Sequence, residues 1–150
     1  MAQPYIPNSR SNTPGTANSG NNFVGVYYNS SDNLWTPQFQ LTAGTKYEFS
    51  FMWAGADEND GWSGAVVVND MQSPVGADTL GIFVTPSDEP STDYQKATFC
   101  FTPATSGVYS FGVEIEATFN PWFLSFDDFN LIERLNSAGT GGTVDACQIE

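Results

Sequence analysis

The sequence of 150 residues lacks histidine altogether, and it has only four basic residues against seventeen acidic ones, for a formal net charge of −13. Without histidine, the chain cannot form a histidine-based catalytic triad or a metal site with histidine ligands. Phosphate binding needs clustered basic residues, so we expect no nucleic-acid partner and no attachment to an anionic membrane surface. The acidic excess keeps a protein soluble and also suits hard cations, above all calcium.

Cysteine and long apolar runs are scarce as well. The two cysteines, Cys100 and Cys147, are too few for a disulfide scaffold and match no zinc spacing, although they could pair with each other. No run is long and apolar enough to cross a membrane, so membrane insertion is not expected. No apolar run follows the first residues either, so we expect no signal peptide. The chain reads as a module of a larger multidomain protein, which makes the missing signal uninformative.

Aromatic residues, by contrast, make up 15% of the chain, while runs with a helical period are absent. The most informative stretch, 39–53, reads FQLTAGTKYEFSFMW. After its glycine turn, Tyr47, Phe49, Phe51 and Trp53 occupy every second position. A period of two places these four rings on one face of a strand, and that face must be buried.

Eight or so short strands at even spacing predict an all-β fold, an antiparallel jelly-roll β-sandwich of two sheets. We expect residues 1–22 to form an irregular N-terminal segment, residues 23–133 the sandwich, and residues 134–150 a linker to a further module. The expected strands cover residues 23–28, 38–41, 46–53, 65–68, 80–84, 94–102, 108–116 and 122–131. The predicted core contains Tyr47, Phe49, Phe51, Phe99, Phe101, Tyr109, Phe111 and Val113.

Three segments, in order, resemble a known family: DNLWTPQFQLTAGTKYEFSFMW, YQKATFCFTPATSGVYSFGVEI and FLSFDDFNLIE. Together they are similar to the cleaved-adhesin and choice-of-anchor J jelly-roll domains of large secreted bacterial surface proteins, over about residues 19–133. The same architecture occurs in MAM domains and in many carbohydrate-binding modules. The usual extra first strand and early tryptophan are missing, with only Tyr5 and Ile6 to stand in. The resemblance implies adhesion or glycan binding, a structural calcium ion, and no catalysis.

Asp127 and Asp128 lie in the last expected strand between two phenylalanines, so alternation turns one carboxylate toward the apolar side. In the resembling sandwiches an aspartate at this point often binds calcium, which makes this pair the first candidate for metal ligands. The alternative is a hydrogen-bonded structural aspartate, or one turned outward by a bulge. Asp57 and Asp60, in the polar loop DENDG, are a second metal candidate, with an ordinary solvated turn as the alternative because the calcium-loop pattern is incomplete.

Two tryptophans follow turn signals. Trp62 comes after a glycine and Trp122 after a proline, and exposed rings in loops can stack on the apolar faces of sugars. The alternative is that both rings cap the ends of the core. We read the other two tryptophans, Trp35 and Trp53, as strand residues and assign them to the core.

The sequence therefore favours a non-catalytic adhesion or ligand-binding module of a secreted or cell-surface bacterial protein, with calcium as a structural cofactor. The expected partner is a glycan or a protein on a host or cell surface. A carbohydrate-binding module that targets an attached enzyme to polysaccharide is one alternative, and a structural spacer is another. Glu114 and Glu116 form a carboxylate pair of the kind that glycosidases use, but alternating glutamates on an exposed strand also simply keep a sheet soluble.

Overall fold

The structure is a computed structural model, and it describes residues 3–5, 17–27, 31–56, 62–84, 91–117 and 123–134. These residues form strands and no helix. The ten strands are β1 (Gln3–Tyr5), β2 (Phe23–Tyr27), β3 (Ser31–Trp35), β4 (Phe39–Leu41), β5 (Lys46–Ala56), β6 (Trp62–Asn69), β7 (Asp78–Val84), β8 (Ser91–Phe101), β9 (Gly107–Ala117) and β10 (Phe123–Arg134). Within the same ranges there is no helix that could span a membrane.

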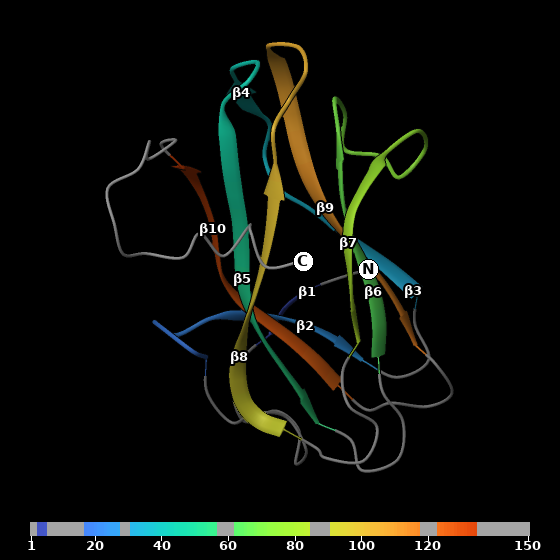
Figure 1. Cartoon of the computed structure of the whole chain (residues 1–150). Coiled ribbons are helices and arrows are strands. Elements are labelled where there is room, and N and C mark those ends of the chain that lie inside the picture. Colours follow the sequence, from blue (N-terminus) through green and yellow to red (C-terminus); the bar gives the residue numbers. More distant parts are fainter. Residues whose placement is uncertain are drawn as a thin grey trace.

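The strands form two antiparallel sheets that pack as a sandwich (Figure 1). The first sheet has the order β1-β2-β10-β5-β8, and the second has the order β3-β9-β6-β7, with the short β4 also pairing with β9. Most neighbouring strands are far apart in sequence, as when β10 lies between β2 and β5, and only the pairs β1-β2 and β6-β7 are consecutive among the strands that the structure describes. This non-sequential order confirms the predicted all-β sandwich.

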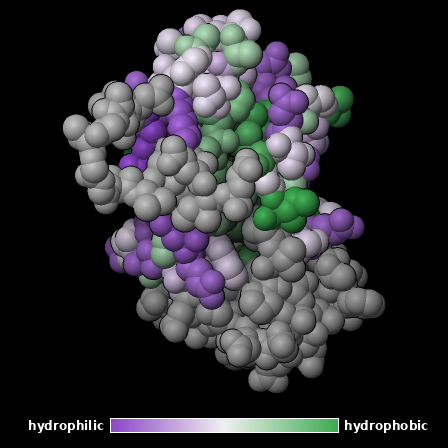
Figure 2. Space-filling view, viewed as in Figure 1, coloured by the Kyte–Doolittle hydropathy of each residue, from purple (hydrophilic) through white to green (hydrophobic). Residues whose placement is uncertain are grey.

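The core lies between the sheets and is largely aromatic. Phe49 of the first sheet stacks on Phe111 of the second, with ring centroids 4.9 Å apart, and this contact joins the two layers. Phe51, which is fully buried, meets Phe99 and Phe126 at 6.1 Å and 5.5 Å. In Figure 2 a band of hydrophobic residues follows the middle of the view, between hydrophilic residues on both sides. All eight predicted core residues belong to this cluster or pack against it.

The N-terminal segment differs from the expectation. Gln3–Tyr5 form strand β1, which pairs with β2, and so the segment supplies an edge strand to the first sheet instead of being irregular throughout. The strand that holds Trp35 is β3, which begins at Ser31 and pairs with β9, separately from the strand expected at residues 38–41.

Cys100 of β8 is disulfide-bonded. The chain has one other cysteine, Cys147, which lies outside the described residues. Cys100 is therefore not a free thiol, and its pairing with Cys147 stays a prediction.

Candidate functional site

The outer face of the second sheet carries a row of side chains from four strands. On β9, the buried Phe111, Val113 and Ile115 point into the core, so the residues between them lie on the outer face. Glu114 is opposite Asn33 of β3 on one side and opposite Ala65 of β6 on the other. Ala65 is in turn opposite Ile82 of β7. Paired residues share a face, so Asn33, Glu114, Ala65 and Ile82 form one row across the sheet, which we call the central row.

A second row follows two residues further along each strand. In it, Glu116 of β9 lies between Ser31 of β3 and Ser63 of β6. Two residues of a strand span about 7 Å, so the carboxylate-bearing positions of the two rows are neighbours on the same surface.

These two rows line an open groove of about 490 Å³, which we call the outer groove. Its middle strand contributes only the small residues Ser63, Gly64 and Ala65, while larger side chains stand on the flanking strands. Ile82, which is 72% exposed, stands on one side as an uncovered apolar surface. The hollow thus follows from residue size, because small residues on β6 lower the surface between β7 and β9.

Trp35 lies on the same outer face, next to the central row. It is opposite Gly112 of β9, and a Cβ atom added at Gly112 would lie 2.8 Å from two atoms of the indole ring. The ring therefore lies directly against the glycine backbone. Val67, which is opposite Gly112 on the other side, is only 2% exposed.

The assignment of Trp35 to the core is therefore wrong. Trp35 is half-buried on the outer face, because its neighbour Leu34 takes the inward position opposite the buried Val113. Trp53, in contrast, is 7% exposed and belongs to the core, as expected. A glycine in the middle of a strand often marks close approach of another group, so Gly112 was the signal for the position of Trp35.

The structure does not describe the side chains of the two predicted sugar-binding tryptophans or of the two predicted metal ligands in the DENDG loop. The backbone at Trp62 begins β6, opposite Ala117 and next to Ser63 of the outer groove, but its side chain is not described. Trp122, Asp57 and Asp60 lie outside the described residues. Their roles stay predictions.

Asp127 and Asp128 lie at a break in the pairing of β10 with β5. The register shifts between Asp127 and Asn130, and Asp128 has a φ of 51°, in the left-handed region. This bulge turns the Asp128 carboxylate out to solvent and leaves that of Asp127 partly exposed. The expectation that alternation turns one aspartate toward the core is wrong, because a bulge breaks the alternation here.

The aspartate pair fastens the N-terminal segment to β10. The backbone N–H of Ser19 donates to Asp127 Oδ2 at 3.0 Å, and the side chain of Asn18 donates to Asp128 Oδ2 at 2.6 Å. The Ser19 hydroxyl donates to Asp128 Oδ1, and the Asp128 N–H donates to Asp127 Oδ1 at 2.8 Å. The bonds from Ser19 and Asn18 favour the charged form and hold the pKa of Asp128 below its usual range.

Beside this pair lie two buried hydroxyl groups. Those of Tyr94 and Ser125 interact with each other, although their geometry falls short of a regular hydrogen bond. Burial, and next the negative charge of Asp127, raise the pKa of Tyr94 to about 12. The neutral form of Tyr94 is therefore favoured in the folded protein.

The fit of this region to a calcium ion is mixed. Each of the four carboxylate oxygens already accepts a hydrogen bond from a described residue, as in the structural alternative. Among the described residues there is no group of three or more acidic or cysteine side chains that could hold a metal. A carboxylate oxygen has a second lone pair, however, and the oxygen of the buried Ser125 hydroxyl is the type of ligand that calcium takes. The predicted site stays a prediction.

No family model and no curated protein matches the sequence. Solved structures do match the fold. TmCBM61, solved in complex with β-1,4-galactotriose, aligns with a TM-score of 0.59 and 16% identity, over 89% of this chain and 82% of that one. The K3 cleaved adhesin domain of Lys-gingipain from Porphyromonas gingivalis aligns with a TM-score of 0.55 and 15% identity, over 87% of this chain and 90% of that one. These matches confirm the jelly-roll type of fold that the sequence resemblance predicted.

The same fold also occurs in an enzyme. The Stig cyclase Fisc from Fischerella sp. TAU aligns with a TM-score of 0.54 and 15% identity, over 89% of this chain and 76% of that one. At such identities the likeness describes the fold alone. The function of this chain must therefore be argued from its own surface.

Proposed function

We propose that this chain is a non-catalytic ligand-binding module, and that its outer groove binds a glycan. The observation that carries the proposal is the open groove of about 490 Å³ on the second sheet, with exposed polar groups on β3 and β9 along one side and the apolar Ile82 on the other. Sugars present hydroxyl groups at their edges and apolar C–H groups on their faces, so they need both kinds of surface.

The polar side chains of the groove suit hydroxyl groups. Asn33 can donate and accept hydrogen bonds, Ser31 and Ser63 can do both, and Glu114 accepts them. The half-buried Trp35 lies two residues along β3 from Asn33 of the groove, on the same face, where its ring can extend the apolar surface. Two of the matched folds are a galactotriose-binding module and an adhesin domain, which supports this class of function without identifying the sugar.

The test is a glycan array, followed by calorimetry with the best-bound oligosaccharide. Asn33→Ala should weaken binding about tenfold, because a hydrogen-bonding group of the ligand would lose its partner. Asn130→Ala is a matched control, since Asn130 is an exposed residue of the first sheet. If no glycan binds, the alternative of a structural spacer is favoured, and release of reducing ends from a bound glycan would overturn the non-catalytic assignment.

We also propose that the module works outside the cell, as part of a longer secreted or surface protein. The disulfide at Cys100 supports this, because disulfides persist in oxidising compartments. Mass mapping of the native protein tests the proposal, since a fully reduced Cys100 in protein from its natural source would contradict it.

Calcium as a structural cofactor remains part of the proposal. The candidate ligands are Asp127 and Asp128, with the Ser125 hydroxyl within the same region of β10. Binding there would further stabilise the attachment of residues 18 and 19.

A further inference from the structure

We infer that the glycan of the outer groove carries protonated amino groups, as a polymer of hexosamine with free amines does. This inference rests on the proposed function and narrows the ligand to one class of glycan. Its basis is the charge of the groove, whose outward-facing carboxylates are those of Glu114 and Glu116, with no lysine or arginine among the described residues that line it.

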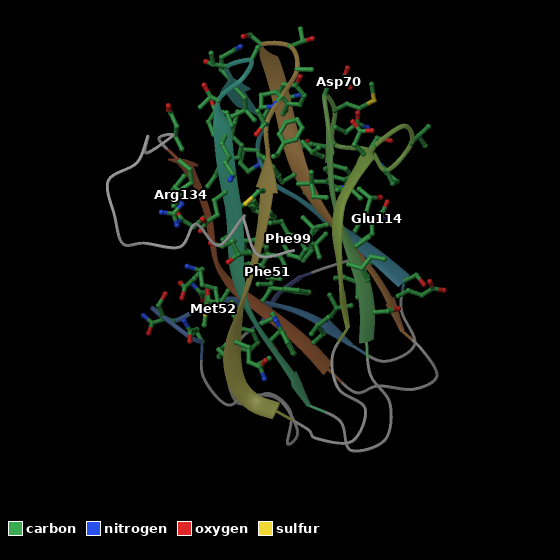
Figure 3. All side chains as sticks on the ribbon, in the orientation of Figure 1. Phe51, Met52, Asp70, Phe99, Glu114 and Arg134 are labelled. Atoms are coloured by element: carbon green, nitrogen blue, oxygen red, sulfur yellow. The ribbon has the colours of Figure 1, made fainter. Side chains whose placement is uncertain are left out.

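The few basic residues of the chain are elsewhere. Lys46, Lys96 and Arg134 belong to β5, β8 and β10 of the first sheet, and Arg10 lies outside the described residues. Figure 3 shows Glu114 on the second sheet and Arg134 on the far side of the first. Arg134 is already held there by Glu48, at 2.7 Å. The described cations therefore lie on the opposite side of the sandwich, and none of them lines the groove.

The arrangement of Glu114 and Glu116 strengthens the argument. The two side chains share a face of β9, about 7 Å apart along the strand, and like charges this close repel each other. A concave surface of one sign also concentrates its electric field. A neutral sugar would leave this repulsion in place, whereas an ammonium group between the two carboxylates would relieve it.

Hydrogen-bond chemistry points to the same ligand. An ionised carboxylate can only accept hydrogen bonds, and an ammonium group can only donate them. Bonds between the two are charge-assisted and stronger than neutral ones. Ser31 and Ser63, on either side of Glu116, remain for the sugar hydroxyls, and Ile82 for an apolar face of the ring. A polyuronate, in contrast, would meet both the local carboxylates and a net charge of −13.

The experiment compares three oligosaccharide probes of equal length by calorimetry: fully deacetylated glucosamine, its N-acetylated form, and galacturonate. We expect the glucosamine oligomer to bind at least about tenfold tighter than the N-acetylated one, and galacturonate not to bind. Raising the salt concentration to about 1 M, where the Debye length is about 3 Å, should weaken glucosamine binding strongly.

The double variant Glu114→Gln/Glu116→Gln separates a specific site from general attraction to an acidic protein. It should lose at least about tenfold in affinity for the glucosamine oligomer, while Glu133→Gln, an exposed residue of β10 on the first sheet, should lose little. An equal loss of affinity in the double variant and in Glu133→Gln would overturn the inference. Equal or tighter binding of the N-acetylated probe to the unmodified protein would overturn it as well. Binding of neutral sugars that depends on Asn33 would overturn the inference but support the proposed function, whereas binding of none of the probes or of the array glycans would overturn both.

Discussion

Replacing Gly112 by alanine tests the position of Trp35 directly. The new Cβ would lie 2.8 to 2.9 Å from three atoms of the Trp35 ring, whereas ordinary van der Waals contact begins at 3.4 Å. The ring must therefore move by at least about 0.6 Å, or the β3–β9 pairing must open. Overpacking of this kind costs about 1–3 kcal/mol of folding free energy.

The chain offers a matched control on the same strand. At Gly107 an added Cβ would meet only Tyr109 Cε2, at 3.9 Å, which is ordinary contact. Gly107→Ala should leave stability unchanged or raise it by about 0.5 kcal/mol, because alanine lowers the entropy of the unfolded chain. The two variants should thus differ by about 2 kcal/mol, or about 4–8 °C in melting temperature for a chain of this size.

Urea unfolding of both variants measures this difference, and a double variant assigns it. Trp35→Leu should remove most of the penalty at Gly112, because the smaller side chain leaves room for the added methyl group. If Gly112→Ala is as stable as Gly107→Ala, or if Trp35→Leu does not reduce the penalty, then the ring does not lie against Gly112. Trp35 would then have no place beside the outer groove.

Three further predictions concern the first sheet. The melting temperature should be higher with millimolar calcium than with EDTA, because an ion that binds only the folded state stabilises it. Identical melting curves would leave Asp127 and Asp128 as hydrogen-bond acceptors only. Absorbance titration should show Tyr94 ionising near pH 12, and Asp127→Asn should lower that pKa. Because the unfolded chain loses the Tyr94 proton near pH 10 while the folded chain keeps it, the free energy of unfolding should fall as the pH rises from about 10 to 12. An unchanged Tyr94 titration in Asp127→Asn would contradict the contribution of the Asp127 charge. Peptide mapping without reductant should link Cys100 to Cys147, and reduction should cost up to about 4 kcal/mol for a loop of this length; an unchanged melt after reduction would show that the bond constrains only a loose tail.

Strand identity was predictable because a single strand carries its own signal. The alternation of Tyr47, Phe49 and Phe51 predicts which face of β5 is buried without reference to any other part of the chain. The structure confirms this prediction. The same reasoning predicted Phe111 and Val113 on β9. Long strands with bulky rings at every second position leave only one way to bury them.

Positions that depend on a partner strand were not predictable in the same way. Leu34 and Trp35 are adjacent and both apolar, so alternation alone cannot tell which one points inward; the answer depends on Val113 and Gly112 across the pair. The bulge at Asp128 is likewise a property of the pairing between β10 and β5. The outer groove is formed by residues of four strands. The sequence of β9 alone therefore could not distinguish Glu114 and Glu116 from the ordinary charged residues of a solvent-exposed strand face.

The two outer faces of the sandwich differ in burial and in charge. On the first sheet, Glu48 and Ser50 of β5 are 2% and 3% exposed, and Ser125 of β10 is fully buried, although all three alternate with core residues and so face outward. Glu48 is partnered there by Arg134, and a buried carboxylate needs such a partner. A hollow of about 430 Å³ remains on that face, but it carries a cation, Lys96, beside Asp128, whereas no lysine or arginine among the described residues lines the outer groove. The face with Glu116 and Ile82 is open, and a ligand would meet it without any rearrangement of the strands.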